Sequence, residues 1–165
     1  MTEQSQPAGF HPIRRDRLPE TVMDSYKTKG KLPEPTVCPD CGAVFHAGHW
    51  QWLAKPKDAH QTTCPACHRV RDHFPAGYVS LHGEFFAAHE QEILQLIQHR
   101  ETQEKAGHPL QRIMDIEKTK RGTVVTTTDV HLARGIGEAL HHAYQGELEF
   151  HHNPEQNLLR VSWSR

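Results

Sequence analysis

Cysteine pairs stand at Cys38-Pro39-Asp40-Cys41-Gly42 and Cys64-Pro65-Ala66-Cys67-His68, and these two stretches hold all four cysteines of the 165-residue chain. Each Cys-x-x-Cys turn directs both of its sulfur atoms toward one point, and Gly42 suits the left-handed backbone position that often closes such a turn. Two pairs together supply four sulfur ligands for a tetrahedral zinc ion, with Zn–S distances of about 2.3 Å. The sequence therefore predicts one structural zinc site that organises the N-terminal half of the chain.

The predicted zinc site is closed. Four thiolates fill the tetrahedron, so no position remains at which a bound water molecule could become a nucleophile. Metal binding contributes on the order of 10–16 kcal/mol to the folding of zinc-finger peptides. Because the segment around the cysteines is poor in apolar residues, metal binding is expected to drive its folding.

Three other interpretations of the cysteines are open. Cys64-x-x-Cys67-His68 also matches a c-type haem attachment motif, but this motif needs an exported chain and leaves Cys38 and Cys41 without a role. The two pairs are also similar to those of rubredoxin, a one-electron iron carrier, although His68 stands where glycine is usual, and iron is kept as the alternative to zinc. A histidine could replace one cysteine ligand, but the spacings fit poorly for the nearby ones, His46, His49, His60 and His73.

The segment between the cysteine pairs combines aromatic and basic residues. Trp50 and Trp52 stand close to Lys55 and Lys57, and such rings can stack on bases while the lysines contact phosphate. At least one of the two tryptophans is expected instead to cover the zinc site. Other candidate phosphate contacts are the basic residues that follow the second cysteine pair and those near a later turn: Arg69, Arg71, Lys118, Lys120 and Arg121.

Three regions are expected along the chain. Residues 1–35 form a proline-rich, basic arm without apolar periodicity, residues 36–83 form the zinc ribbon, and residues 84–165 form an α+β domain. A short strand is expected at 77–82, before the helices and strands of the α+β domain. That domain is predicted to be a small ferredoxin-like antiparallel sheet with two helices on one face. Its expected helices cover residues 84–105 and 130–145, and its expected strands cover 110–118, 123–128, 147–151 and 158–163.

Composition and motifs argue against an enzyme and against a membrane protein. The formal net charge is −1, so the chain has no overall basic field that would hold nucleic acid. No apolar stretch approaches the roughly 20 residues that cross a bilayer, and the N-terminus lacks a signal pattern, so a soluble cytoplasmic protein without a membrane partner is expected. Gly135-Ile136-Gly137 lies inside a predicted helix and is expected to allow close packing rather than phosphate binding. Neither a catalytic residue nor a small-molecule substrate is predicted.

One stretch carries a family resemblance. Cys64-Pro65-Ala66-Cys67-His68-Arg69-Val70 and the following Pro75-Ala76-Gly77, together with the first cysteine pair, resemble the zinc-binding N-terminal part of the archaeal and eukaryotic large-ribosomal-subunit export adaptor, a nonsense-mediated-decay-type family. The runs at 126–134 and 159–165 resemble segments that follow there. From about residue 24 onward, the chain is more similar to a small bacterial group related to that adaptor. Because the chain is far shorter and has fewer cysteines, the export function does not carry over.

The resemblance implies a protein that binds the ribosome, at its large subunit, or structured RNA. Together with the closed zinc site, it favours a non-enzymatic binding protein that acts in ribosome assembly or under stress. The alternatives are a protein–protein adaptor without RNA contact, which the near-neutral charge favours, and a rubredoxin-like iron electron carrier.

Overall fold

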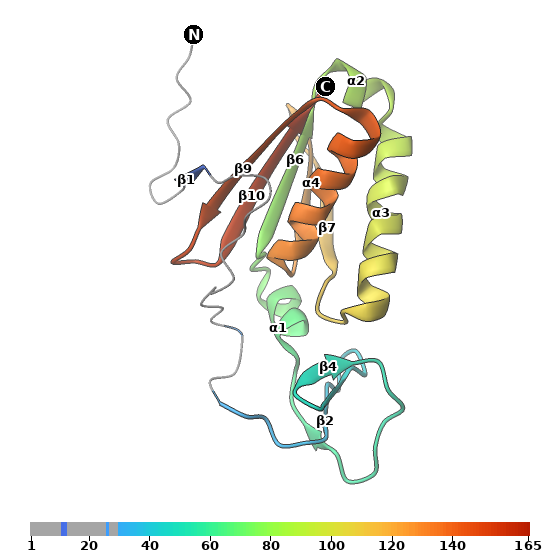
Figure 1. The fold of residues 1–165 in the computed structure, drawn as a ribbon, viewed down its shortest axis with the longest axis vertical. Helices are drawn as coiled ribbons and strands as arrows, with labels where there is room; N and C mark the ends of the chain where they lie inside the picture. Colours follow the sequence, from blue (N-terminus) through green and yellow to red (C-terminus); the bar gives the residue numbers. More distant parts are fainter. Residues whose placement is uncertain (1–10, 13–25, 27–29) are drawn as a thin grey trace.

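The computed structural model describes residues 11–12, 26 and 30–165, and most of the arm expected over residues 1–35 lies outside this part of the chain. The described residues form a mixed α+β structure with four helices and two sheets. Figure 1 shows the smaller sheet at one end of the molecule and the larger sheet, with two long helices on one side, at the other. The prediction of an α+β fold is therefore confirmed.

The smaller sheet surrounds the cysteines. Its strands are β2 (Thr36–Val37), β3 (Val44–His46), β4 (His49–Gln51) and β5 (His60–Gln61), in the order β4-β3-β2-β5. The β2–β3 and β3–β4 pairs are antiparallel, whereas β5 runs parallel to β2. A short helix, α1 (Pro65–Asp72), follows β5 and leads to the larger sheet. We call residues 36–72 the cysteine region.

The larger sheet has six strands in the order β1-β9-β10-β6-β8-β7. Two of its strands precede residue 84 in the chain: β1 (His11–Pro12) and β6 (Gly77–His82). The others are β7 (Ile113–Lys118), β8 (Gly122–Thr127), β9 (Glu147–Asn153) and β10 (Leu158–Ser164). The α+β domain was expected to begin at residue 84. Because β6 lies between β10 and β8, the larger sheet also includes residues that precede this position.

The larger sheet is not purely antiparallel, so that part of the prediction is wrong. β9 and β10 form an antiparallel hairpin, and this hairpin places β10 between β9 and β6. As a result β10 runs parallel to β6, with Arg160 opposite Tyr78 and Ser162 opposite Ser80. The other pairs in this sheet, β1–β9, β9–β10, β6–β8 and β8–β7, are antiparallel.

Helices cover one face of the larger sheet. α4 (Val130–Tyr144) packs on β10, β6 and β9, and α3 (Glu90–Gly107) packs beside α4, as Figure 1 shows. Side chains alternate along each strand, so every second residue enters the core. Val79 of β6, Val125 of β8 and Val161 of β10 are all at most 1% exposed in this core. The residues between them, such as Ser80 and Ser162, point to the opposite face, on which no described helix packs and which we call the open face.

Two local features refine the predicted helices. The helix expected over residues 84–105 is divided into α2 (Glu84–Ala88) and α3, because His89 has a non-helical backbone with φ −122° and ψ 21°. Gly137 of α4 confirms the expected close packing, since a Cβ atom there would lie 2.7 Å from Cγ1 of Val161. Asp129 begins α4 by accepting bonds from the backbone amides of His131 and Leu132.

Candidate metal centre

The four cysteines form one cluster. The ligand atoms of Cys38, Cys41, Cys64 and Cys67 all lie within 4.8 Å of one another, and no other group of this kind occurs in the described residues. The sulfurs of Cys41 and Cys64 are 3.9 Å apart, close to the edge of about 3.8 Å that follows from four Zn–S bonds of about 2.3 Å in a tetrahedron. The four thiols therefore fit a tetrahedral metal ion such as zinc or iron.

Local backbone structure brings each pair of sulfurs together. Cys38 follows β2, and its carbonyl accepts a bond from the amide of Gly42, whose φ of 82° is the predicted left-handed position. Cys64 is the N-cap of α1, and Pro65 occupies the first turn of that helix. The Cys67 amide, in that turn, points at the Cys64 sulfur at 3.4 Å. The N-terminus of α1 thus positions the sulfurs of Cys64 and Cys67.

The sulfurs are mostly buried, and backbone amides point at two of them. Cys38 and Cys64 are fully buried, and burial raises the pKa of the Cys64 thiol far above its ordinary value. Burial also acts to raise the pKa of Cys38, but backbone amides, first that of Cys64, outweigh it, so the pKa of Cys38 is lowered. The Cys64 amide lies 3.3 Å from the Cys38 sulfur. Amides that point at sulfur are suited to a thiolate, which is the form that binds a metal.

Arg112 is a further member of the centre, and it comes from outside the cysteine region. Its Nη1 lies 3.2 Å from the Cys67 sulfur, and its Nη2 lies 3.0 Å from the Cys41 sulfur and 3.6 Å from the Cys64 sulfur. Burial acts to lower the pKa of Arg112, but the bond to Cys67 and the nearby sulfurs outweigh it and raise this pKa. The guanidinium therefore stays charged and offsets the negative charge of the thiolates.

Arg112 is itself fixed by the larger sheet. Its Nε donates to the carbonyl of Pro109 at 2.8 Å, and its backbone amide donates to the hydroxyl of Thr128 at 2.9 Å. The Thr128 amide donates back to the Arg112 carbonyl, also at 2.9 Å. Thr128 directly precedes the residue that caps α4. Arg112 thus connects the sulfur cluster to the start of the helix that packs on the larger sheet.

The sequence pattern did not single out Arg112. The residue stands 45 positions after Cys67 in the chain, beyond any spacing that a cysteine motif fixes. The only local signal is an isolated arginine near the start of the strand expected over residues 110–118, and many exposed arginines share that setting.

The tryptophans between the cysteine pairs have different surroundings. Trp50 packs against the cysteine cluster together with Leu110, and its ring meets Phe45 edge-on at 5.6 Å, so the expectation that one tryptophan covers the site is confirmed. Trp52 is 38% exposed and donates from Nε1 to the carbonyl of Lys105 at 2.7 Å. Trp52 therefore links the cysteine region to the end of α3.

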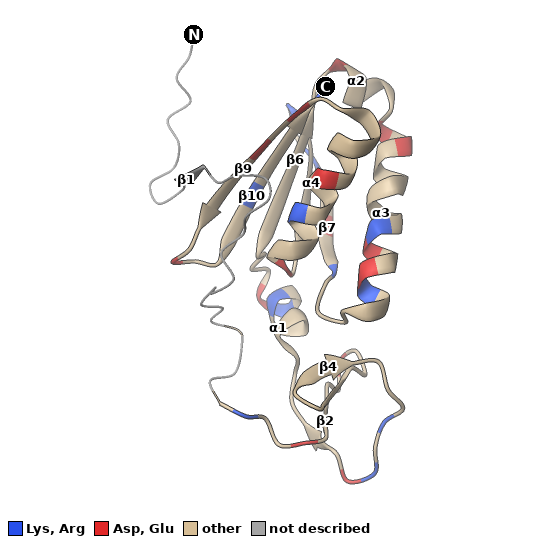
Figure 2. Cartoon of the chain, viewed as in Figure 1, with Lys and Arg blue, Asp and Glu red and all other residues tan. Residues whose placement is uncertain are grey.

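The candidate phosphate contacts do not form one surface. Lys55 and Lys57 are exposed in the loop between β4 and β5, at the lower end of the molecule in Figure 2. Lys120 and Arg121 are exposed in the β7–β8 turn, beside the end of β6, whereas the cysteine region joins the start of β6. Six residues of strand separate these ends, a distance of about 20 Å at about 3.3 Å per residue.

Three of the basic candidates are engaged elsewhere. Arg69 is 1% exposed, donates to the Phe74 carbonyl at 3.0 Å and lies over the ring of Tyr26, so its side chain is buried away from the surface. Arg71 pairs with Asp40 at 2.5 Å, and Lys118 pairs with Glu90 at 3.5 Å. These contacts leave Lys55, Lys57, Lys120 and Arg121 as the better candidates.

Comparisons of the chain with protein-family models, with curated proteins and with solved structures found no match. No helix in the described part of the chain is both long enough and apolar enough to cross a membrane.

Proposed function

We propose that this chain is a non-enzymatic, zinc-stabilised protein that binds RNA, on the large ribosomal subunit or in another structured RNA. The observation that carries the proposal is the closed set of four cysteine sulfurs, which lies beside an exposed loop that bears Lys55 and Lys57. A bound zinc ion would supply structural bonds to the four sulfurs, because no ligand position is left for chemistry.

The loop with Lys55 and Lys57 has the features of a contact surface for phosphate. Both lysines are exposed, and no ion pair with either is found among the described residues. Trp52 ties the start of the loop to α3, so the lysines project from a fixed base. Figure 2 shows this loop extending from the cysteine region on the side away from the larger sheet. Unpaired cations on a fixed loop suit electrostatic contact with an RNA backbone.

Sedimentation of the tagged full-length protein through sucrose gradients tests this proposal. Zinc-loaded protein is expected to migrate with the large subunit at low salt and to leave it at high salt. Lys55→Glu together with Lys57→Glu should weaken this association and flatten its salt dependence. Lys105→Glu is the control for a charge reversal outside the loop, because Lys105 is exposed at the end of α3 and holds Trp52 through its backbone carbonyl, which the substitution keeps. If the double variant migrates as the wild-type protein does, the proposal is contradicted. If the purified protein is red and redox-active, the bound metal is iron rather than zinc, and electron transfer becomes the favoured function.

A second candidate function is a protein–protein adaptor. It is favoured by the large apolar side chains that the cysteine region and the residues next to it leave exposed: Trp52, Leu53, Val70 and Phe74, at 38%, 45%, 43% and 47%. Apolar side chains mark protein contacts where they are exposed together, and Trp52 is adjacent to Leu53 while Val70 and Phe74 are four residues apart. Capture of a protein partner that survives nuclease treatment, with no sedimentation on ribosomes, would favour the adaptor.

A further inference from the structure

The open face of the larger sheet carries an arrangement of polar side chains that the metal centre does not use. Along β6 this face presents Tyr78, Ser80 and His82, and along β10 the register places Arg160, Ser162 and Ser164 directly beside them. All six side chains are at least partly exposed. These six residues of β6 and β10 therefore form a continuous polar surface that contains the Tyr78 ring and the His82 imidazole and no carboxylate.

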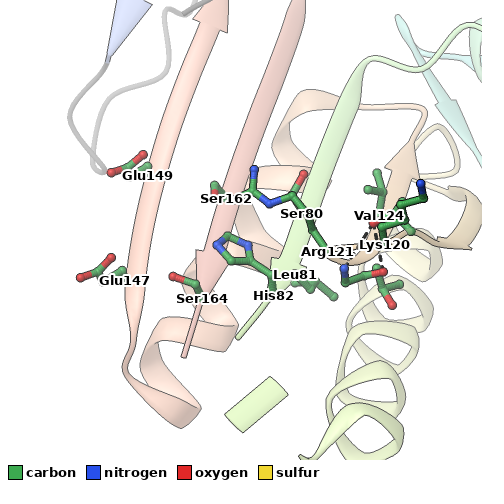
Figure 3. Close-up of a pocket in the computed structure, with 13 residues that line it drawn as sticks. Ser80, Leu81, His82, Lys120, Arg121, Val124, Glu147, Glu149, Ser162 and Ser164 are labelled. Atoms are coloured by element: carbon green, nitrogen blue, oxygen red, sulfur yellow. Dashed lines mark hydrogen bonds between the residues drawn. The ribbon is translucent and has the colours of Figure 1, made fainter. Parts of the chain in front are cut away.

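A cavity of about 580 Å³ lies at one end of this surface. Its lining includes Ser80, His82, Ser162 and Ser164 from β6 and β10, and Lys120 and Arg121 from the β7–β8 turn. Glu147 and Glu149 of β9 line its other side. Figure 3 shows the Arg121 side chain extending from the turn across β6 toward Ser162. The volume lies within the range of about 300–1,000 Å³ that small-ligand sites occupy. A guanidinium that lines a cavity together with hydroxyl groups is suited to an anionic oxygen such as that of a phosphate.

Beside the cavity, Tyr78 of β6 and Arg160 of β10 offer a surface on which a base can stack. The guanidinium of Arg160 lies 4.6 Å from the centre of the Tyr78 ring. Arginine planes and aromatic rings are the groups on which unpaired bases stack in proteins that bind single-stranded nucleic acid. Because Tyr78 and Ser80 are two residues apart on β6, the Tyr78–Arg160 pair and the Ser80–Ser162 pair are about 7 Å apart along the sheet. A base stacked on the first pair and a phosphate bound near the second are therefore within reach of one RNA strand.

Acidic residues flank this surface on both sides. On β9, Glu149 lies opposite Ser162 and Glu147 opposite Ser164. On the other edge, β7 places Asp115 opposite Thr126 and Glu117 opposite Val124. Glu149 also lies 3.6 Å from His151. Carboxylates at both edges repel phosphate, so a polyanion is confined to the central strands, and Glu147 and Glu149 are left to accept hydrogen bonds from ribose hydroxyls or base amino groups.

From this charge pattern we infer that the open face binds an unpaired segment of RNA along β6 and β10, with a phosphate under Arg121 and a base on the Tyr78–Arg160 stack. This inference rests on the proposed RNA-binding function and adds a second contact surface, distant from Lys55 and Lys57. A structured RNA that offers both a folded part and an unpaired strand can engage both ends of the molecule.

Fluorescence anisotropy with a labelled single-stranded RNA of about 12 nucleotides, within the range of known single-strand site sizes, tests the inference on the zinc-loaded full chain. Arg121→Glu is expected to weaken binding about tenfold or more and to reduce the salt slope by about one phosphate contact. Tyr78→Leu should weaken binding about tenfold, while Tyr78→Phe, which keeps the ring, should bind as wild type does. Lys105→Glu, on the helix-covered side, is the charge-matched control and should not change binding.

The outcomes separate the two proposals. Wild-type affinity in both Arg121→Glu and Tyr78→Leu, in a protein that still migrates with ribosomes, would overturn the open-face site and leave the proposed function standing. Failure of the wild-type protein both to bind the RNA and to migrate with ribosomes would overturn both. Free adenosine monophosphate that binds as tightly as the RNA would overturn the assignment to an RNA strand.

Discussion

The guanidinium of Arg112 lies 3.0 Å from the sulfur of Cys41, although 71 positions separate the two residues in the chain. The contact joins the cysteine region to the segment that leads into β7, and the same side chain contacts the sulfurs of Cys64 and Cys67. Arg112 therefore both offsets the charge of the sulfurs and joins the cysteine region to the segment that leads into β7.

Replacing Arg112 is expected to weaken metal binding. Arg112→Gln removes the positive charge beside the thiolates, and loss of such a supporting group typically lowers metal affinity about 10- to 100-fold. Competition for zinc with a chromophoric chelator measures this effect. Arg71→Gln is the control, because Arg71 lies within the cysteine region but pairs with Asp40 rather than with a sulfur. Equal zinc affinity in Arg112→Gln and wild type would show that the sulfurs need no neutralising partner.

Two glycines of α4 should respond to alanine in opposite directions. A Cβ at Gly135 would meet its nearest atom, Nη2 of Arg100, at an ordinary 3.5 Å, so Gly135→Ala should raise the free energy of unfolding by about 0.5–1 kcal/mol. A Cβ at Gly137 would lie 2.7 Å from Val161 and 3.0 Å from Leu148, so Gly137→Ala should lower it by about 1–3 kcal/mol. Chemical denaturation of the two variants compares them directly, and stabilisation by both would mean that β10 packs less tightly against α4 than described.

Acid should destabilise the larger sheet through His152. Burial lowers the pKa of this histidine below its ordinary value of 6.5, and its Nε2 has no hydrogen-bond partner among the described residues. Below about pH 6.5 the unfolded chain binds a proton that the folded chain does not, so the free energy of unfolding falls as the pH drops from there to the lowered pKa. Above pH 6.5 this contribution is constant.

The contribution of His152 is expected to be a loss of stability in acid that disappears when the imidazole is removed. Denaturation of wild type and His152→Leu between pH 5 and 8 measures it, with His151→Gln, on the open face, as the control. The leucine variant should lose less stability in acid than wild type. An identical pH dependence in the two proteins would assign the acid sensitivity to other groups.

The metal ligands and most helices and strands followed from the sequence because their determinants are local. The Cys-x-x-Cys turns, the β-branched run of β8 and the aspartate that caps α4 each act within a few residues. The strand order did not follow, because the β9–β10 hairpin is compatible with either strand lying next to β6. Only packing of Leu159, Val161 and Trp163 beneath α4 selects β10, and that choice joins distant parts of the chain.

The candidate site was likewise predictable only where its determinants are local in the sequence. Spacing identifies the four sulfurs, but burial of Arg69 and the approach of Arg112 depend on how the cysteine region meets the sheet. Basic residues also look alike in a sequence, whether they pair with a neighbouring carboxylate, as Arg71 and Lys118 do, or remain exposed, as Lys55 and Arg121 do.

The central position of β10 has a consequence for the order of events during synthesis. β6 leaves the ribosome long before β10, yet one of its edges can pair only when residues 158–164 have been made. Pairing between such distant segments is slow, and β6 exposes an unpaired edge until β10 pairs with it. The cysteine region uses only contacts within residues 36–72 for its own sheet and can bind metal earlier. A nascent chain would then carry a folded metal site while the strands that follow still await their partner.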